Sequence, residues 1–128
     1  MDETTHIPHP AWSYPAVIYE LNVRQLTPEG TFAAAEKHLP RLRELGIDAV
    51  WLMPVYPIGV EGRKGSLGSY YSVRDYCAVD PCLGTMEDFD AFVAEAHRLG
   101  MKVLLDWIAN HTAVSYTHLR AHETLMNL

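Results

Sequence analysis

The 128-residue sequence has only two cysteines, no glycine-rich phosphate fingerprint and no apolar run as long as a membrane helix. Cys77 and Cys82 are too few for a disulfide framework or a closed zinc site, so we expect free thiols in a reducing compartment. A membrane-spanning helix needs about 20 consecutive apolar residues. The stretch LNVRQLTPEG fits neither G-x-G-x-x-G nor a P-loop, which argues against a Rossmann nucleotide domain.

Positive charge is also scarce. Ten Lys and Arg residues stand against sixteen Asp and Glu residues, for a net charge of −6, and the basic residues form no cluster. We therefore expect neither a nucleic acid nor an anionic membrane as partner. The first residues, MDETTHIPHPAW, lack the basic and apolar regions of a secretory signal, so the predicted location is cytoplasmic.

The first half of the chain alternates between strand and helix patterns. Residues 16–23 are rich in β-branched residues and predict a strand. A helix then begins at the capping residue Thr31 and ends at Gly46, with a kink or restart at Pro40, which has no backbone N–H. Residues 47–54, IDAVWLMP, are almost all apolar and predict a strand buried on both faces. The apolar stripe of the predicted helix is Phe32, Ala35, Leu39, Leu42 and Leu45.

The second half repeats this order after a long irregular connection. Residues 54–84 show no sustained period, and connections of that length tend to be functional. Thr85 and Asp88 fit a capping box, Gly100 ends the helix that follows, and KVLLDWIANH predicts a third strand. Alternating strands and helices predict an α/β fold with a parallel sheet. Because three strands alone would expose apolar edges, we expect a truncated N-terminal portion of a (β/α)8 TIM barrel, with about three strands and two helices.

Polar side chains follow the third predicted strand. Asp106, Asn110 and His111 lie where that strand ends. Enzymes with barrels or open α/β sheets carry their chemistry at the carboxyl ends of the strands. An unrelated metallohydrolase that uses Asp106 and His111 ranks last, because the chain lacks an H-x-H or H-E-x-x-H ligand set.

The last fifteen residues, VSYTHLRAHETLMNL, differ from the rest. They have neither a clean period nor a turn followed by the amphipathic helix that should come next, and they resemble a translated sequencing adapter. We therefore divide the chain into an N-terminal extension (1–15), a partial catalytic barrel (16–113) and a non-native tail (114–128). The tail's His118, His122 and Glu123 are assigned no function.

Three motifs in series carry a family resemblance. GIDAVWLMPVYP, GSYYSVRDYCAVDPCLGTMEDF and DWIANH resemble, in order and spacing, the opening of the catalytic barrel of the α-amylase family, glycoside hydrolase family 13. VIYELNVRQLTPEGTF is similar to the family's first strand and turn. The resemblance implies a glycosidase that acts on α-glucosidic bonds by retaining double displacement. Its substrates would be α-glucans, oligosaccharides or disaccharides.

The resemblance also implies roles for individual residues. Tyr71 matches the tyrosine that stacks beneath the sugar where the bond is cut, and His111 matches the histidine that hydrogen-bonds that sugar. Asp106 matches an aspartate that organises the site. Asn110 matches a position that binds calcium in many members through its side-chain oxygen, a ligand that suits this ion, with the other ligands outside this chain. Ser72 departs from the aspartate of many amylases, which concerns substrate preference.

The catalytic carboxylates themselves are missing. Retaining glycosidases need two carboxylates about 5 Å apart. The family carries its nucleophilic aspartate after strand four, its acid/base glutamate after strand five and a third aspartate after strand seven. We therefore expect a parent glycosidase but an inactive isolated chain. The alternative, a non-catalytic α-amylase-like interaction protein, is disfavoured because Tyr71 and His111 are both present. Other aspartates are interpreted as loop or capping residues: Asp75, Asp80 and Asp88.

Overall fold

The computed structural model describes residues 7–59, 70–71 and 73–109, and three parallel strands form its centre. They are β1 (Ile18–Leu21), β2 (Ala49–Leu52) and β3 (Lys102–Leu105), in the order β1-β2-β3. Matched rows run across the sheet, with each residue of β2 paired to one residue of β1 and one of β3. The prediction of a parallel α/β sheet is confirmed, although each strand is shorter than its apolar run.

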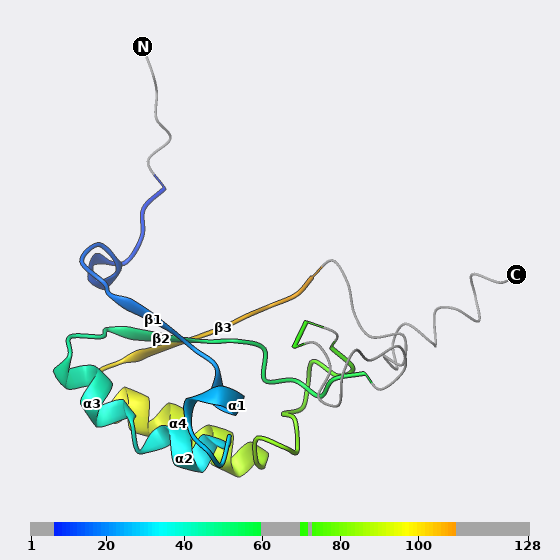
Figure 1. Cartoon of the computed structure of the whole chain (residues 1–128). Coiled ribbons are helices and arrows are strands. Elements are labelled where there is room, and N and C mark those ends of the chain that lie inside the picture. The colour runs from blue at the N-terminus through cyan, green and yellow to red at the C-terminus, as the bar shows by residue number, and fades with distance from the viewer. Residues whose placement is uncertain (1–6, 60–69, 72, 110–128) are drawn as a thin grey trace, which may run out of the picture.

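In the described residues, four α-helices accompany the sheet, after a short 3-10 turn at Ala11–Ser13. They are α1 (Val23–Leu26), α2 (Phe32–Glu36), α3 (Leu39–Glu44) and α4 (Met86–Arg98). Figure 1 shows α2, α3 and α4 together on one face of the sheet. Within the described ranges, no helix has the length and apolar character needed to cross a membrane.

The predicted helix between Thr31 and Gly46 is two helices, α2 and α3. Pro40 lies in the first turn of α3, where its missing N–H costs nothing because first-turn amides have no partner within the helix. The restart expected at Pro40 is therefore confirmed. Helix α1 was not predicted, because four residues directly after a strand are too few to show a helical period.

Local capping chemistry sets the helix ends as predicted. The Thr31 side chain accepts a hydrogen bond from the backbone of Ala34 at 3.3 Å. At α4 both arms of the capping box form: the Asp88 N–H donates to Thr85 Oγ1 at 3.1 Å, and the Thr85 N–H donates to Asp88 Oδ2 at 2.9 Å. Gly100 follows α4 with φ +76°, a left-handed conformation that favours glycine.

In the part of the chain that the structure describes, the core lies between the sheet and the helices on one side of the sheet. Phe32 and Phe92, from α2 and α4, are fully buried there. Leu45 was expected in the core stripe, and this was wrong: it is 68% exposed, because α3 ends one residue earlier and the chain turns. Other core residues include Leu21, Ala35, Leu39, Leu42, Val50, Leu52, Ala96 and Met101.

The opposite face of the sheet is open. Trp51 and Leu104 pair across β2 and β3, and Trp51 is 39% exposed. The expectation that the second strand is buried on both faces is therefore wrong for this face, because no described element covers it. The side chains of Val50 and Leu52, which alternate with Trp51, point to the helices and are buried.

The connection after β2 is held by backbone pairing. Ile58 and Val73 form an antiparallel bridge, and the N–H of Asp80 donates to the carbonyl of Val55 at 2.7 Å. These contacts fold the later described part of the connection back on the residues that follow β2.

Asp75 and Asp80 are loop residues, as predicted. The Asp75 carboxylate accepts from the N–H of Cys77 at 2.8 Å, and that of Asp80 accepts from the N–H of Cys82 at 2.9 Å. Each aspartate thus closes a turn on the residue two places later. Both cysteines are exposed, and neither is in a disulfide, as expected.

Candidate functional site

Asp106 lies at the carboxyl edge of the sheet. It directly follows β3, and its N–H still donates to the carbonyl of Leu52 on β2, at 3.3 Å. Because side chains alternate along a strand, Asp106 projects on the same face as Leu104, the open face. Its half-buried carboxylate therefore lies on the open face at the carboxyl edge of the sheet, and strand geometry rather than a loop holds it there.

Tyr71 lies beside Asp106, although 35 residues separate them in sequence. Tyr71 is 37% exposed. Partial burial raises the pKa of its phenol, and the negative charges of Asp106 and Glu20 and a hydrogen bond to the Asp106 side chain raise it further. The structure thus brings together two of the predicted site residues, one directly after β3 and one from the long connection.

Glu20 was missed by the sequence reasoning. It lies on β1 in the same row as Trp51 and Leu104, so it faces the open side of the sheet. A carboxylate inside an apolar strand, two residues from Ile18, was the available signal. Its charge reaches Tyr71, which makes this edge of the sheet acidic.

Among the described residues, Tyr56 also lies near Asp106 and contacts Tyr76. The rings of Tyr56 and Tyr76 meet edge to face, with centroids 5.4 Å apart. Burial raises the pKa of Tyr56, and the nearby charge of Asp106 and the Tyr76 phenol add to this effect. The Tyr76 hydroxyl donates to the carbonyl of Ile108, which ties the connection to the residues just after β3.

The two adjacent tyrosines of the connection have different partners. Tyr71 faces Asp106, whereas the hydroxyl of Tyr70 accepts hydrogen bonds from Asn22 and Arg24. The position matched to the sugar-stacking tyrosine is therefore the one at the carboxyl edge of β3.

Two predicted site residues, Asn110 and His111, lie outside the described residues, as does Ser72. Within the part of the chain that the structure describes, no three His, Cys, Asp or Glu side chains are grouped so as to hold a metal ion. The calcium assignment to Asn110 thus stays a prediction.

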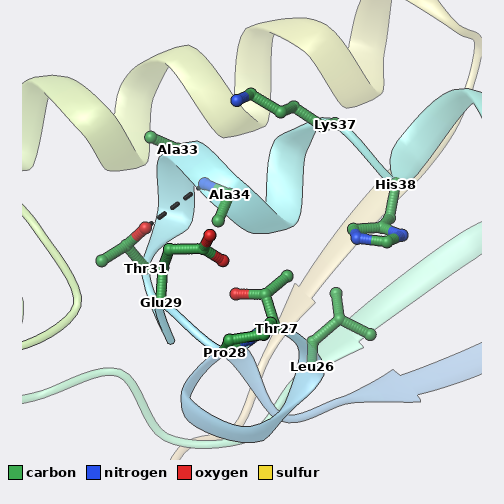
Figure 2. A pocket seen from close by; sticks show the side chains of 9 residues that line it. All are labelled: Leu26, Thr27, Pro28, Glu29, Thr31, Ala33, Ala34, Lys37 and His38. Atoms are coloured by element: carbon green, nitrogen blue, oxygen red, sulfur yellow. Dashed lines mark hydrogen bonds between the residues drawn. The ribbon is translucent and has the colours of Figure 1, made fainter.

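Two of the hollows on the described surface differ in their relation to the site. One, of about 500 Å³, lies on the open face of the sheet, where it includes Asp106 and the 74% exposed Trp107. The other, of about 470 Å³, lies between α1 and α2 (Figure 2). Its chargeable side chains are Glu29, Lys37 and His38, and it contains none of the predicted site residues. Of these two hollows, the first is continuous with the site, because it includes Asp106. Its lining also includes Ile18, Trp51, Leu104 and Leu105.

The fold and site together define a class: an α/β unit whose polar site lies at the carboxyl edge of a parallel sheet, as in barrel enzymes. Comparison with known families gives the family. A family model for the catalytic domain of α-amylase matches residues 12–125, a range that extends into the last fifteen residues. The chain belongs to the α-amylase catalytic-domain family, as its motifs had indicated.

Curated relatives with different activities share this region. The chain is 35% identical to trehalose-6-phosphate hydrolase of Escherichia coli over 121 residues, which cover 91% of the chain and 20% of that protein. It is 38% identical to trehalose synthase of Thermus thermophilus over 114 residues, which cover 84% of the chain and 11% of that protein. The chain therefore spans about a fifth or less of the length of these relatives.

Solved structures agree with the predicted architecture. An α-amylase from Lactobacillus plantarum superposes with a TM-score of 0.83 at 42% identity, over 85% of this chain and 26% of that one. A maltogenic α-amylase from Thermotoga neapolitana gives 0.80 at 47% identity, over 84% and 26%. These neighbours are TIM barrels, so the three strands and their helices correspond to part of a (β/α)8 barrel.

Proposed function

We propose that the whole protein is an α-amylase-family enzyme that acts on α-glucosidic bonds, and that this chain supplies part of its sugar-binding subsite. Family membership supports the reaction class, and the placement of Tyr71 beside Asp106 is the observation that carries the site. Relatives are named for trehalose phosphate hydrolysis, trehalose synthesis and α-glucosidase activity. The proposed substrate is accordingly an α-glucan, oligosaccharide or disaccharide.

Tyr71 is proposed to offer its ring to the sugar. A tyrosine ring has an apolar face for C–H groups and a polar end that needs a partner. Here the Tyr71 hydroxyl is hydrogen-bonded to the Asp106 side chain, which restrains the ring while leaving part of it exposed. Asp106 thereby has an organising role, and His111 is proposed to hydrogen-bond the same sugar.

Double displacement is proposed for the whole enzyme and not for this chain. Its two steps need a carboxylate nucleophile and a carboxylic acid that later acts as base. The described residues end just after the third strand, whereas the family places these groups after strands four and five. Asp106 is engaged by Tyr71, so we assign it neither role. The isolated chain is proposed to bind sugar weakly and to cleave none.

The test uses the 128-residue chain with maltose as ligand and 4-nitrophenyl α-D-glucoside as substrate. Maltose should shift the NMR signals of Tyr71. Its affinity for the chain should be lower when Tyr71 is replaced by Ala. The matched control is Tyr14→Ala, since Tyr14 is an exposed tyrosine that stacks on His9 away from the site. No 4-nitrophenol should be released. Release that survives repurification and disappears in Asp106→Asn would contradict the assignment of roles.

Three further assignments need separate tests, and two of them concern residues outside the described ranges. Calcium binding at Asn110 predicts that Asn110→Ala lowers calcium affinity, which calorimetry on the whole enzyme would measure. The proposal that residues 114–128 are non-native predicts that genomic DNA read across codon 113 encodes a different sequence. A cytoplasmic location is proposed as well, and fractionation of the source cells would test it.

A further inference from the structure

Tyr70 is gripped from the end of the first strand. Its hydroxyl accepts one hydrogen bond from Asn22 Nδ2 at 2.9 Å and another from Arg24 Nε at 2.8 Å. The guanidinium carbon of Arg24 also lies 3.9 Å from the centre of the Tyr70 ring. A cation over an aromatic face is attracted by the electron-rich ring, so this tyrosine is held by its ring and by its hydroxyl.

The two gripping residues are themselves fixed by the core. Asn22 follows β1 directly, and its neighbours Leu21 and Val23 are buried. Asn22 is the N-cap residue of α1, yet its side chain makes no capping hydrogen bond. Asparagine is a favoured N-cap residue whose side chain usually accepts a hydrogen bond from the first turn of the helix. Here the Asn22 side chain instead donates to Tyr70.

The turn at Gly30 packs against the backbone of Arg24. Gly30 has φ +65°, and a Cβ at this position would lie 2.8 Å from the carbonyl oxygen of Arg24. Only glycine fits such an approach without a shift of the backbone. The backbone of Arg24 is therefore seated against the chain that leads into α2.

The position of Tyr70 restricts the position of its neighbour, Tyr71. Adjacent Cα atoms are about 3.8 Å apart, so a fixed Tyr70 restricts the backbone of Tyr71. The two side chains serve different ends: Tyr70 points to β1 and α1, and Tyr71 points to Asp106.

We infer that Asn22 and Arg24 are positioning residues that act through Tyr70 to hold the Tyr71 ring beside Asp106. This inference rests on the proposed function, in which the Tyr71 ring receives a sugar. Neither gripping residue needs to touch the sugar. Their effect is to keep Tyr71 in the orientation that the sugar requires, which reduces the ordering that binding would otherwise have to supply.

The experiment compares the full chain with Tyr70→Phe, which keeps the ring and removes the hydroxyl, and with Arg24→Gln. The first measurement is the pKa of Tyr71, from ring-carbon NMR signals of tyrosine-labelled protein assigned with Tyr71→Phe. In both variants this pKa should fall toward that of ordinary tyrosine, because the phenol moves away from Asp106. The second measurement is the dissociation constant for maltose, which should rise about tenfold.

Matched variants separate positioning from general damage. Arg41→Gln removes an exposed arginine from α3 and should change neither measurement. Arg24→Lys keeps the charge without the planar donor set, so it should restore part of the maltose affinity. Asn22→Ala, which removes one of the two donors to Tyr70, is used in place of Tyr70→Phe if that variant lacks the native circular dichroism spectrum.

An unchanged Tyr71 pKa in both Arg24→Gln and Tyr70→Phe would overturn the inference, even if maltose binding fell, since Arg24 would then act on the sugar directly. A lowered Tyr71 pKa would support it. If the pKa falls but the unaltered chain shows no maltose binding, the positioning role stands and the proposed sugar subsite fails.

Discussion

Replacement of Phe92 by alanine tests whether the helix layer holds the sheet in place. Phe92 lies on α4 with 0% exposure, and its ring centroid is 6.2 Å from that of Phe32 on α2. Phe32 also meets Phe89 edge to face at 5.5 Å. Loss of a buried phenylalanine costs about 3–5 kcal/mol, of which about 0.5–1.5 kcal/mol belongs to an aromatic pair. Such a loss is large beside the roughly 5–15 kcal/mol that stabilises a typical domain.

The assay is urea unfolding of the full chain, followed by far-ultraviolet circular dichroism at one protein concentration. Phe92→Leu keeps most of the volume and should cost about 1.5 kcal/mol or less. Met86→Ala changes an exposed residue of the same helix and should alter the free energy of unfolding by about 0.5 kcal/mol at most. Equal midpoints for Phe92→Ala and Met86→Ala would refute the packing of α4 on α2.

Three further predictions concern caps and titrating groups. Thr85→Ala removes one arm of the capping box and should cost about 1 kcal/mol, seen as faster amide exchange in the first turn of α4. Asp106→Asn removes a negative charge beside Tyr71, so the pKa of Tyr71 should fall in a spectrophotometric titration. An unchanged pKa would contradict the placement of Tyr71 beside Asp106. The backbone N–H of Val17 lowers the pKa of Asp48, so stability present at neutral pH should be lost as pH falls below about 4. Asp48→Asn should flatten that acid dependence of the urea midpoint.

Local chemistry could be predicted from the sequence, and contacts between distant segments could not. The capping box of Thr85 and Asp88 and the stop at Gly100 depend on residues within a few positions of one another. The parallel sheet followed from the alternation of patterns. The shortness of each strand was not predictable, since apolar residues such as Val23 serve the core equally well from a helix.

The site shows the same division. Asp106 could be placed at the carboxyl edge from its position after an apolar run, and Tyr71 entered through the family resemblance. The contacts of Tyr70 with Asn22 and Arg24 join residues 48 and 46 positions apart. No periodicity or turn signal spans such a separation. The charge of Glu20 at the same edge depends on the pairing of β1 with β2, which only the fold supplies.

The rows of the sheet limit how β3 can change in length. Leu105 pairs with Leu52, and Asp106 comes next on the opposite face. Deletion of one residue inside β3 would move every later residue back by one place, so that the aspartate would take the place of Leu105 on the other face and Trp107 would take its place at the site. Natural variation in this strand should therefore consist of substitutions, with insertions and deletions confined to the connections on either side.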